Sequence, residues 1–303
     1  MKKICLVSVY FGTFPNNARY FFESVKHNTT INFLCFSDIN PEELEYEIPD
    51  NFCIIHMDFE EFNKKLEDAL QIQYNMEKVY KICDFRPFFG IIFRDELNGY
   101  DYWGFHDFDM IFGNLRNFLT DDLLNAYDRI FVNGHLSLFK NCERINSICM
   151  EGSSKQTLKD VISTKETIAY DEMSGMRLAF AERGLSQYIN RNIWADIVES
   201  IPTVVNNNMF NRPGQFYMWE DGLLWWCIRK NGQAVKLREL IYVHFQKRKM
   251  QCDEIMQGMP FYIYGKNISH IIPSGDITTS MDIFCFYGSK IHRRIERILR
   301  KTR

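Results

Sequence analysis

Short apolar runs alternate with amphipathic stretches along the first part of the chain, and this alternation predicts a β-α-β opening. Three runs are predominantly apolar and bounded by turn residues, as is typical of buried strands; they lie at 4–9, 31–36 and 52–57. Residues 17–26 carry a helical pattern, and Asp58 with Glu61 predicts a capping box for a helix through Leu70. Because the connections between the strands are long, we expect parallel pairing.

The pattern is less regular in the rest of the chain. Residues 75–93 are expected to be helical with an interruption at Arg86–Pro87, because proline ends one helix and favours the start of the next. Polar helix formers over 141–199 favour a helical insertion. Further strands are expected at 128–132 and 135–139, joined by a bend at Asn133–Gly134, and at 216–219, 223–228 and 234–245.

Together these elements predict an α/β protein with a mixed, mostly parallel sheet flanked by helices. The chain has 303 residues and 46% hydrophobic content, which is enough for a large core. We expect residues 1–140 to form an α/β half and residues 141–199 a helical insertion. Residues 200–287 would complete the same domain, and residues 288–303 would form a basic tail.

Composition and charge narrow the class of protein. The formal net charge of −3 argues against a general nucleic-acid binder, since Lys and Arg are not in excess. The nine cysteines contain no C-x-x-C pair and lie mostly in apolar runs, which predicts free thiols in a reducing cytosol and no zinc site. The apolar run at 4–9 is too short for a signal peptide or a membrane span, so a soluble cytoplasmic protein is expected.

The aromatic stretch 100–109 delivers two carboxylates, Asp107 and Asp109, that are separated by one residue. In an extended backbone residues two apart point to the same side, so both carboxylates are expected to face one ligand from the end of a strand. Two such oxygen donors suit Mg²⁺ or Mn²⁺, whose other ligands are water and substrate phosphate. The alternative is ordinary turn or capping chemistry, but open α/β sheets bind ligands at the carboxyl ends of their strands.

Four stretches of the chain resemble the GT-A class of nucleotide-sugar-dependent glycosyltransferases. Within that class the chain resembles a bacterial family associated with surface-polysaccharide and capsule biosynthesis. The matching stretches are Lys81 to Gly90, His106 to Asn114, Gly134 to Phe139 and Tyr242 to Arg248. The resemblance implies a nucleotide-sugar donor, which the 1–140 half would bind, and a glycan acceptor.

The resemblance also implies a metal site. Asp109 would ligate Mn²⁺ or Mg²⁺ directly, and Asp107 would lie near the donor ribose or a metal-bound water. His244 resembles the C-terminal histidine that completes the metal site, although a lone histidine between Val243 and Phe245 also fits a buried core position. A mixed set of histidine and carboxylate ligands favours Mn²⁺ somewhat over Mg²⁺.

Donor contacts are expected from two further regions. Lys81 or Arg86 would contact phosphate, with Asp84 orienting one of them or a sugar hydroxyl; the alternative is a surface ion-pair cluster. In the loop after the first strand, Tyr10 or Phe11 would stack on uracil. At the end of the second strand, Asp38 would accept a hydrogen bond from base or ribose. The alternative for Tyr10 and Phe11 is that these loop aromatics simply fill the core.

One glycine and two acidic pairs are candidates for the sugar and acceptor side. Gly134 would let the backbone approach the donor sugar, although a hairpin bend explains a glycine equally well. Asp171 and Glu172 are the candidates for the base that removes the acceptor proton, against a role in helix capping. Glu220–Asp221 is a second acidic pair that could serve instead, although Asp221 precedes a glycine as in a plain turn.

The tail has seven basic residues against Glu296 between positions 290 and 303, with apolar residues at helical spacing. Such a helix could bind the anionic inner face of a membrane, beside a lipid-linked glycan acceptor, or it could pack on its own core. The function predicted is metal-dependent transfer of a sugar, most naturally from a UDP-sugar, to a surface glycan. The alternatives are a sugar nucleotidyltransferase, for which the loop after the first strand is a poor match, and a noncatalytic scaffold in a polysaccharide assembly complex.

Overall fold

The computed structural model describes residues 1–275 and 277–301, with side chains described through residue 292. The chain folds into two compact units, and it passes between them several times. The first unit consists of Met1–Phe14, Asn28–Asp107 and Arg116–Asn190, and the second of Pro15–His27, Phe108–Leu115 and Arg191–Arg303. The segments predicted from the sequence follow one another along the chain and do not include these crossings between the two units.

The first unit is built on a seven-stranded sheet with the order β3-β2-β1-β4-β7-β6-β8. Its strands are β1 (Ile4–Val9), β2 (Ile31–Ser37), β3 (Phe52–His56), β4 (Tyr102–His106), β6 (Arg129–Asn133), β7 (Leu136–Lys140) and β8 (Gln187–Tyr188). β1 pairs in parallel with β2 and β4, whereas β7 runs antiparallel to both of its neighbours. The predicted mixed, mostly parallel α/β architecture is confirmed.

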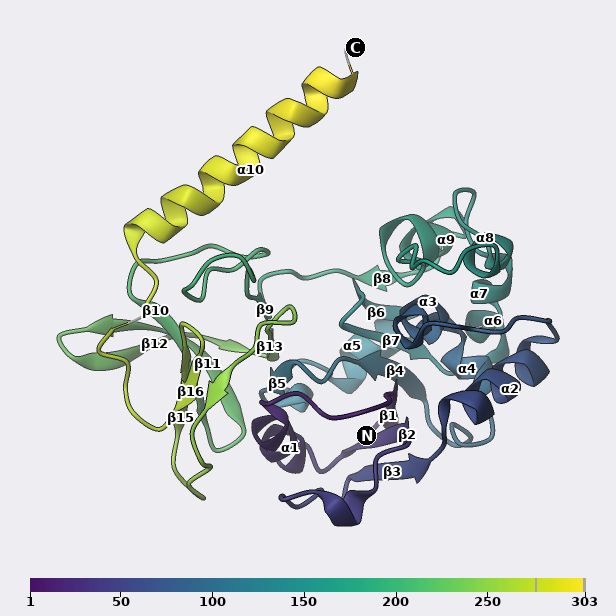
Figure 1. The fold of residues 1–303 in the computed structure, drawn as a ribbon, viewed down its shortest axis with the longest axis horizontal. Helices are drawn as coiled ribbons and strands as arrows, with labels where there is room; N and C mark the ends of the chain where they lie inside the picture. Colours follow the sequence, from purple (N-terminus) through teal and green to yellow (C-terminus); the bar gives the residue numbers. More distant parts are fainter. Residues whose placement is uncertain (276, 302–303) are drawn as a thin grey trace. The chain divides into compact units, whose positions relative to one another are not determined.

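Short helices accompany this sheet (Figure 1). The longest is α2 (Phe59–Leu70), which starts with the predicted capping box of Asp58 and Glu61. The others are α3 (Ile82–Phe85), α4 (Phe89–Ile92), α5 (Asp121–Ala126), α6 (Glu143–Asn146), α7 (Ile148–Glu151), α8 (Leu158–Ile162) and α9 (Leu178–Glu182), with single turns at Pro41–Glu43, Val79–Lys81, Arg86–Phe88, Leu115–Asn117 and a π-turn at Met173–Arg177. The helix expected over 75–93 is thus broken into short pieces around Pro87, because proline lacks the amide that a continuous helix needs.

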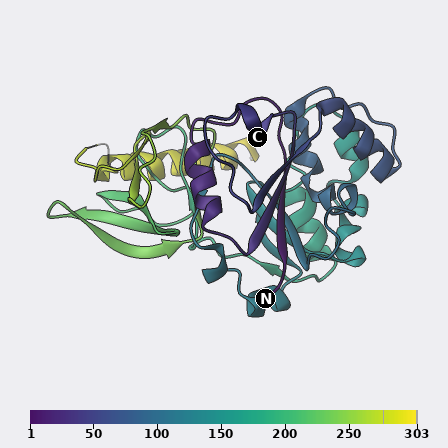
Figure 2. The same cartoon turned by 90° about the horizontal axis from the view of Figure 1, so that it is seen from below.

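The second unit contains two sheets and the helices α1 (Ala18–Lys26) and α10 (Ser280–Lys301). A three-stranded sheet has the order β5-β13-β9, from Met110–Phe112, Tyr242–His244 and Ala195–Asp196. A six-stranded sheet has the order β12-β11-β10-β15-β16-β14, from Gln233–Leu240, Leu223–Lys230, Gln215–Glu220, Phe261–Tyr264, Asn267–Ser269 and Gln251–Cys252. β11 and β12 form the long green hairpin of Figure 2.

The Asp-x-Asp stretch differs from the expected continuous strand. β4 ends at His106, and β5 begins only at Met110. Between them Phe108 packs on Phe21 at a ring distance of 5.0 Å, and its carbonyl accepts a hydrogen bond from Asn17 at 3.0 Å. These contacts hold Phe108 in the second unit's core, so the alternation of faces along β4 does not continue to Asp109.

The C-terminal helix α10, yellow in Figure 1, begins at Ser280, eight residues before the predicted tail at 288–303. The predicted basic side chains from Arg293 onward lie outside the described residues. Among the helices that the structure describes, none has the length and apolar character needed to cross a membrane.

Candidate active site

Arg86 is the centre of a polar cluster in the first unit. It begins the single turn that contains Pro87, and its guanidinium donates to the Asp107 carboxylate and to the carbonyl oxygen of Gly134. A second carboxylate, Asp171, lies 3.8 Å from the same group. Burial alone would lower the pKa of Arg86, but Asp107 raises it above its ordinary value. The cluster therefore carries a permanent internal cation.

Asp171 is a buried carboxylate of this cluster with a raised pKa. Its side chain is buried, and burial raises its pKa to about 7, against the opposing attraction of Arg86. The adjacent Glu172 raises the pKa further. Arg129, itself fully buried, donates to the Asp171 carbonyl oxygen at 2.9 Å and so fixes the backbone at this position. Asp171 can therefore change its protonation state near neutral pH.

Gly134 makes room for the two neighbouring carboxylates. A Cβ atom at this position would lie 2.5 Å from Glu172 Oε1 and 3.2 Å from Asp171 Oδ2. The space in front of Gly134 is thus taken by the chain's own side chains. Glu172 is exposed, whereas Asp171 is buried behind it. The structure brings together four predicted site residues. They are the two base candidates, Asp171 and Glu172, together with Gly134 and Arg86.

Lys81 and Asp84 form a buried ion pair at 2.8 Å next to the segment that carries Asp171. Asp84 also accepts hydrogen bonds from the amides of Ile168 at 2.9 Å and Tyr170 at 3.0 Å, directly before Asp171. Lys81 is only 1% exposed and donates to the carbonyl oxygen of Glu166 at 2.7 Å. This pair holds the segment that carries Asp171, and the predicted phosphate contact of Lys81 stays a prediction.

The loop after β1 is organised by Asp38, which accepts a hydrogen bond from the amide of Gly12 at 2.9 Å. Gly12 has a φ of 95°, a conformation that favours glycine. Tyr10 donates to the carbonyl oxygen of Thr13 at 2.9 Å, and Phe11 packs edge-on against Phe59 at 5.6 Å. Tyr10 and Phe11 therefore lie in an ordered loop after β1, which Asp38 contacts from the end of β2. The contacts of these three residues with a nucleotide stay predictions.

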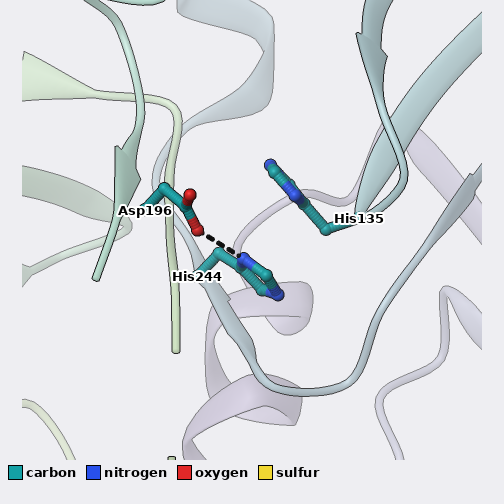
Figure 3. A group of neighbouring side chains, drawn as sticks. All are labelled: His135, Asp196 and His244. Carbon is teal, nitrogen blue, oxygen red and sulfur yellow. Dashed lines mark hydrogen bonds and ion pairs between the residues drawn. The ribbon is translucent and has the colours of Figure 1, made fainter. Parts of the chain in front are cut away.

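A second polar group lies in the second unit, where β13 pairs with β5 and β9. His244 ends β13, and its Nε2 atom lies 3.4 Å from Asp109 Oδ1. Its other ring nitrogen, Nδ1, lies 2.9 Å from Asp196 Oδ1, as the dashed line in Figure 3 shows. Asp109 and His244 each offer a metal-ligand atom, and these atoms lie within 4.8 Å of each other. This donor pair fits a divalent cation.

A strained turn after β13 fixes Asp109. Gln246 and Lys247 both adopt left-handed backbone conformations, with φ of 50° and 63°. This turn directs the Lys247 amide to Asp109 Oδ2 at 2.7 Å, while the Phe245 amide donates to the Asp109 carbonyl oxygen at 2.9 Å. Burial alone would raise the pKa of Asp109, but the His244 side chain and the Lys247 amide lower it below its ordinary value. Asp109 is therefore held as a carboxylate.

Comparison with known proteins places the chain in a family. Residues 6–271 match the group described as Family of unknown function (DUF6625). The chain belongs to this family. No curated protein matches its sequence.

Two solved structures resemble parts of the fold. One is the galactosyltransferase LgtC in complex with donor and acceptor sugar analogues, at 13% identity and a TM-score of 0.38, over 63% of this chain and 75% of the other. The other is apo mouse xyloside xylosyltransferase 1, at 10% identity and a TM-score of 0.40, over 64% of this chain and 88% of the other. Because both TM-scores are low, the function proposed below rests on this chain's own residues.

Two functional positions were missed from the sequence. Asp196 lies in the stretch 141–199 that was predicted to be helical, and a two-residue strand such as β9 shows no periodicity. Arg129 lies near the start of the predicted strand 128–132, where an arginine is ordinarily solvated. Only the structure shows that its guanidinium lies 5.0 and 5.6 Å from the ring centres of Phe139 and Phe180. No sequence signal marks either residue.

Proposed function

We propose that this DUF6625 member is a metal-dependent glycosyltransferase. It would transfer a sugar from a nucleotide-sugar donor to a bacterial surface glycan. The donor proposed first is a UDP-sugar, and the acceptor glycan can be lipid-linked. The single observation that carries the proposal is the pairing of Asp109 with an oriented His244 at the end of an Asp-x-Asp stretch. The side chains of Asp109 and His244 would hold Mn²⁺ or Mg²⁺.

A bound divalent cation supplies charge neutralisation for the departing nucleoside diphosphate. The chain's own contribution is to present fixed donors, because the strained turn at Lys247 and the carboxylate of Asp196 hold Asp109 and His244 in place. Asp107 follows β4 and is fixed by Arg86. Its role at the donor ribose or a metal-bound water remains a prediction.

For the acceptor side, we propose that Glu172 removes the proton from the acceptor hydroxyl. General-base catalysis needs a carboxylate that the substrate can reach, and Glu172 is the exposed member of the Asp171–Glu172 pair. Asp171 lies behind it with a pKa near neutrality, and Arg86 limits the charge that accumulates there. An acceptor base of this kind is what inverting transfer requires.

The decisive experiment incubates the purified protein with UDP-sugars and Mn²⁺ and measures UDP release, with products identified by mass spectrometry. Asp109→Asn should lose the metal-dependent release, whereas Asp95→Asn, a matched change at an exposed aspartate, should retain it. Pyrophosphate formation from a nucleoside triphosphate and a sugar phosphate would instead identify a nucleotidyltransferase. An absence of turnover with every sugar nucleotide would favour the noncatalytic scaffold.

We also propose that α10 meets an anionic membrane surface. Met281, Phe284 and Ile291 are 66%, 73% and 60% exposed at helical spacing, whereas Phe286 on the same helix is buried. Each basic residue of the tail near such a surface adds about 1 kcal/mol. Co-sedimentation with phosphatidylglycerol vesicles should exceed that with neutral vesicles and fall with salt, and Phe284→Ser should weaken it. Equal binding to both vesicle types would contradict this proposal.

A further inference from the structure

His244 and Asp196 are brought together by strand register. β13 and β9 run in parallel, with His244 opposite Asp196 as the last pair of the ladder. The Ile197 amide then donates to the His244 carbonyl oxygen at 2.9 Å, which closes the ladder behind the pair. The two side chains therefore meet at one end of the three-stranded sheet, with Asp196 Oδ1 2.9 Å from His244 Nδ1 (Figure 3).

The Asp196 carboxylate is itself fixed. It is buried, and its second oxygen, Oδ2, accepts a hydrogen bond from the Asn207 side chain at 3.2 Å. Its backbone amide donates to Asn208 Oδ1 at 3.0 Å. Burial, the backbone contact and the contact of Oδ1 with the imidazole orient this carboxylate, and the Asn207 bond adds to them. Asp196 is therefore built to face His244.

This arrangement decides which nitrogen of His244 carries the proton. A carboxylate only accepts hydrogen bonds, so Nδ1 must be the donor and Nε2 of a neutral ring carries the lone pair. That lone pair lies 3.4 Å from Asp109 Oδ1, another electron-rich atom. A metal cation bound between these two atoms would remove the repulsion of two acceptors that face each other.

We propose that Asp196 is a positioning residue that holds His244 in the tautomer required to bind the metal through Nε2. The inference rests on the metal-dependent function proposed above. Carboxylates that receive the second ring N–H of a ligating histidine fix its orientation and raise its basicity, and their loss costs about 10- to 100-fold in metal affinity or activity. Asp196 would thus act on the metal without touching the substrate.

The test compares Mn²⁺ binding in three forms of the full chain, with free Mn²⁺ followed by electron paramagnetic resonance. In Asp196→Asn the new amide can donate to Nδ1 and so favour the wrong tautomer. The Mn²⁺ dissociation constant should rise about 10- to 100-fold. The matched control is Asn207→Ala, which removes the hydrogen bond to Oδ2 but leaves the contact between Oδ1 and His244. It should change the constant by less than about threefold.

A kinetic measurement separates positioning from general damage to the fold. In a donor-hydrolysis assay Asp196→Asn should raise the KM for Mn²⁺ by the same factor and leave kcat at saturating Mn²⁺ nearly unchanged. A loss of kcat at saturating metal, or an unchanged Mn²⁺ dissociation constant, would overturn the positioning role while the metal site stands. No Mn²⁺ binding by the wild-type protein would overturn the proposed function as well.

Discussion

The Arg86 cluster of the first unit and the His244 group of the second unit balance the charge of a carboxylate in different ways. Asp107 is neutralised by a buried guanidinium that cannot lose its charge, and that guanidinium also limits the charge on Asp171. Asp109 instead faces an imidazole whose charge depends on a proton or on a metal. The charge of Asp107 is balanced by the protein itself. The Asp109–His244 pair, in contrast, would be stabilised by an added cation.

This difference teaches that two carboxylates one residue apart can have different partners. Asp107 and Asp109 are separated by one residue, yet each takes its partners from a different compact unit. Of the two carboxylates, Asp109 is the one that faces the His244 ring, and a bound cation would balance the charge of this carboxylate. Changes in the His244 group should therefore act through the metal, and changes in the Arg86 cluster should act through protons.

The largest effect is expected for Asp109→Asn. Removing the charged metal ligand should lower metal-dependent donor turnover on the order of 1,000-fold, since charge neutralisation by a metal contributes several kcal/mol to the transition state. Thermal stabilisation of the protein by Mn²⁺ should disappear in the same variant. Asp95→Asn is the control for the chemical change itself. A full Mn²⁺ shift in the Asp109 variant would assign the metal elsewhere and erase the contrast between the two regions.

A loss of about 100-fold in kcat is expected for Glu172→Gln, in line with the contribution of a general base. Because the Arg86 cluster is metal-independent in this proposal, the KM for Mn²⁺ should not change. Steady-state kinetics at several Mn²⁺ concentrations measure both quantities. A raised KM for Mn²⁺ with an intact kcat would show that Glu172 serves the metal rather than the acceptor.

Much of the fold follows from local sequence signals. The strands β1 to β3, the capped helix α2 and the β6–β7 hairpin lie within a residue or two of the predicted ranges, because apolar runs, a capping box and a glycine bend are local features. The six-stranded sheet of the second unit was not predicted as a separate sheet. Strands were expected where β10, β11 and β12 lie, but β14, β15 and β16 were not predicted. Pairing between distant strands leaves no mark in a single sequence.

The candidate site could be predicted only in part. Asp109 and His244 were named together from motif resemblance, and the structure brings their ligand atoms close. The buried Lys81–Asp84 pair looks like a surface pair in the sequence, because its spacing of three residues is the same in both settings. Burial depends on the segment 166–170 that covers the pair, and sequence spacing cannot report that contact.

A pH-dependent effect is expected for Asp171→Asn. Burial raises the pKa of Asp171 from 3.8 to about 7, so between these values the folded state keeps a proton that the unfolded chain releases. The contribution of this proton to wild-type stability is complete at low pH and is lost as the pH rises toward 7. The variant does not titrate, so its free energy of unfolding relative to wild type should rise by at most about 1.4 kcal/mol per pH unit from pH 4 to 7.

Chemical denaturation at a series of pH values measures this difference. Above pH 7 it should become constant, because Asp171 is then ionised in both states. Asp95→Asn, the same change at an exposed aspartate, serves as the control variant. Parallel stability profiles for wild type and Asp171→Asn would show that Arg86 keeps Asp171 ionised, and the Arg86 cluster would then not act through protons.

The smallest effect is expected for Gly134→Ala, and it separates the role of Glu172 from that of the fold. The new methyl group would lie 2.5 Å from Glu172 Oε1, which is the far end of an exposed side chain and can move away. The free energy of unfolding should therefore fall by less than about 1 kcal/mol, well short of the 1–3 kcal/mol typical of overpacking in a core. Displacing the proposed base should lower kcat about tenfold, because small errors in position are costly in catalysis. Gly275→Ala, where a Cβ meets no atom within 4 Å, should leave both quantities unchanged. If Gly134→Ala keeps full kcat, the position of the Glu172 carboxylate does not matter to the reaction, and the base must be sought at Asp171 or at Glu220–Asp221.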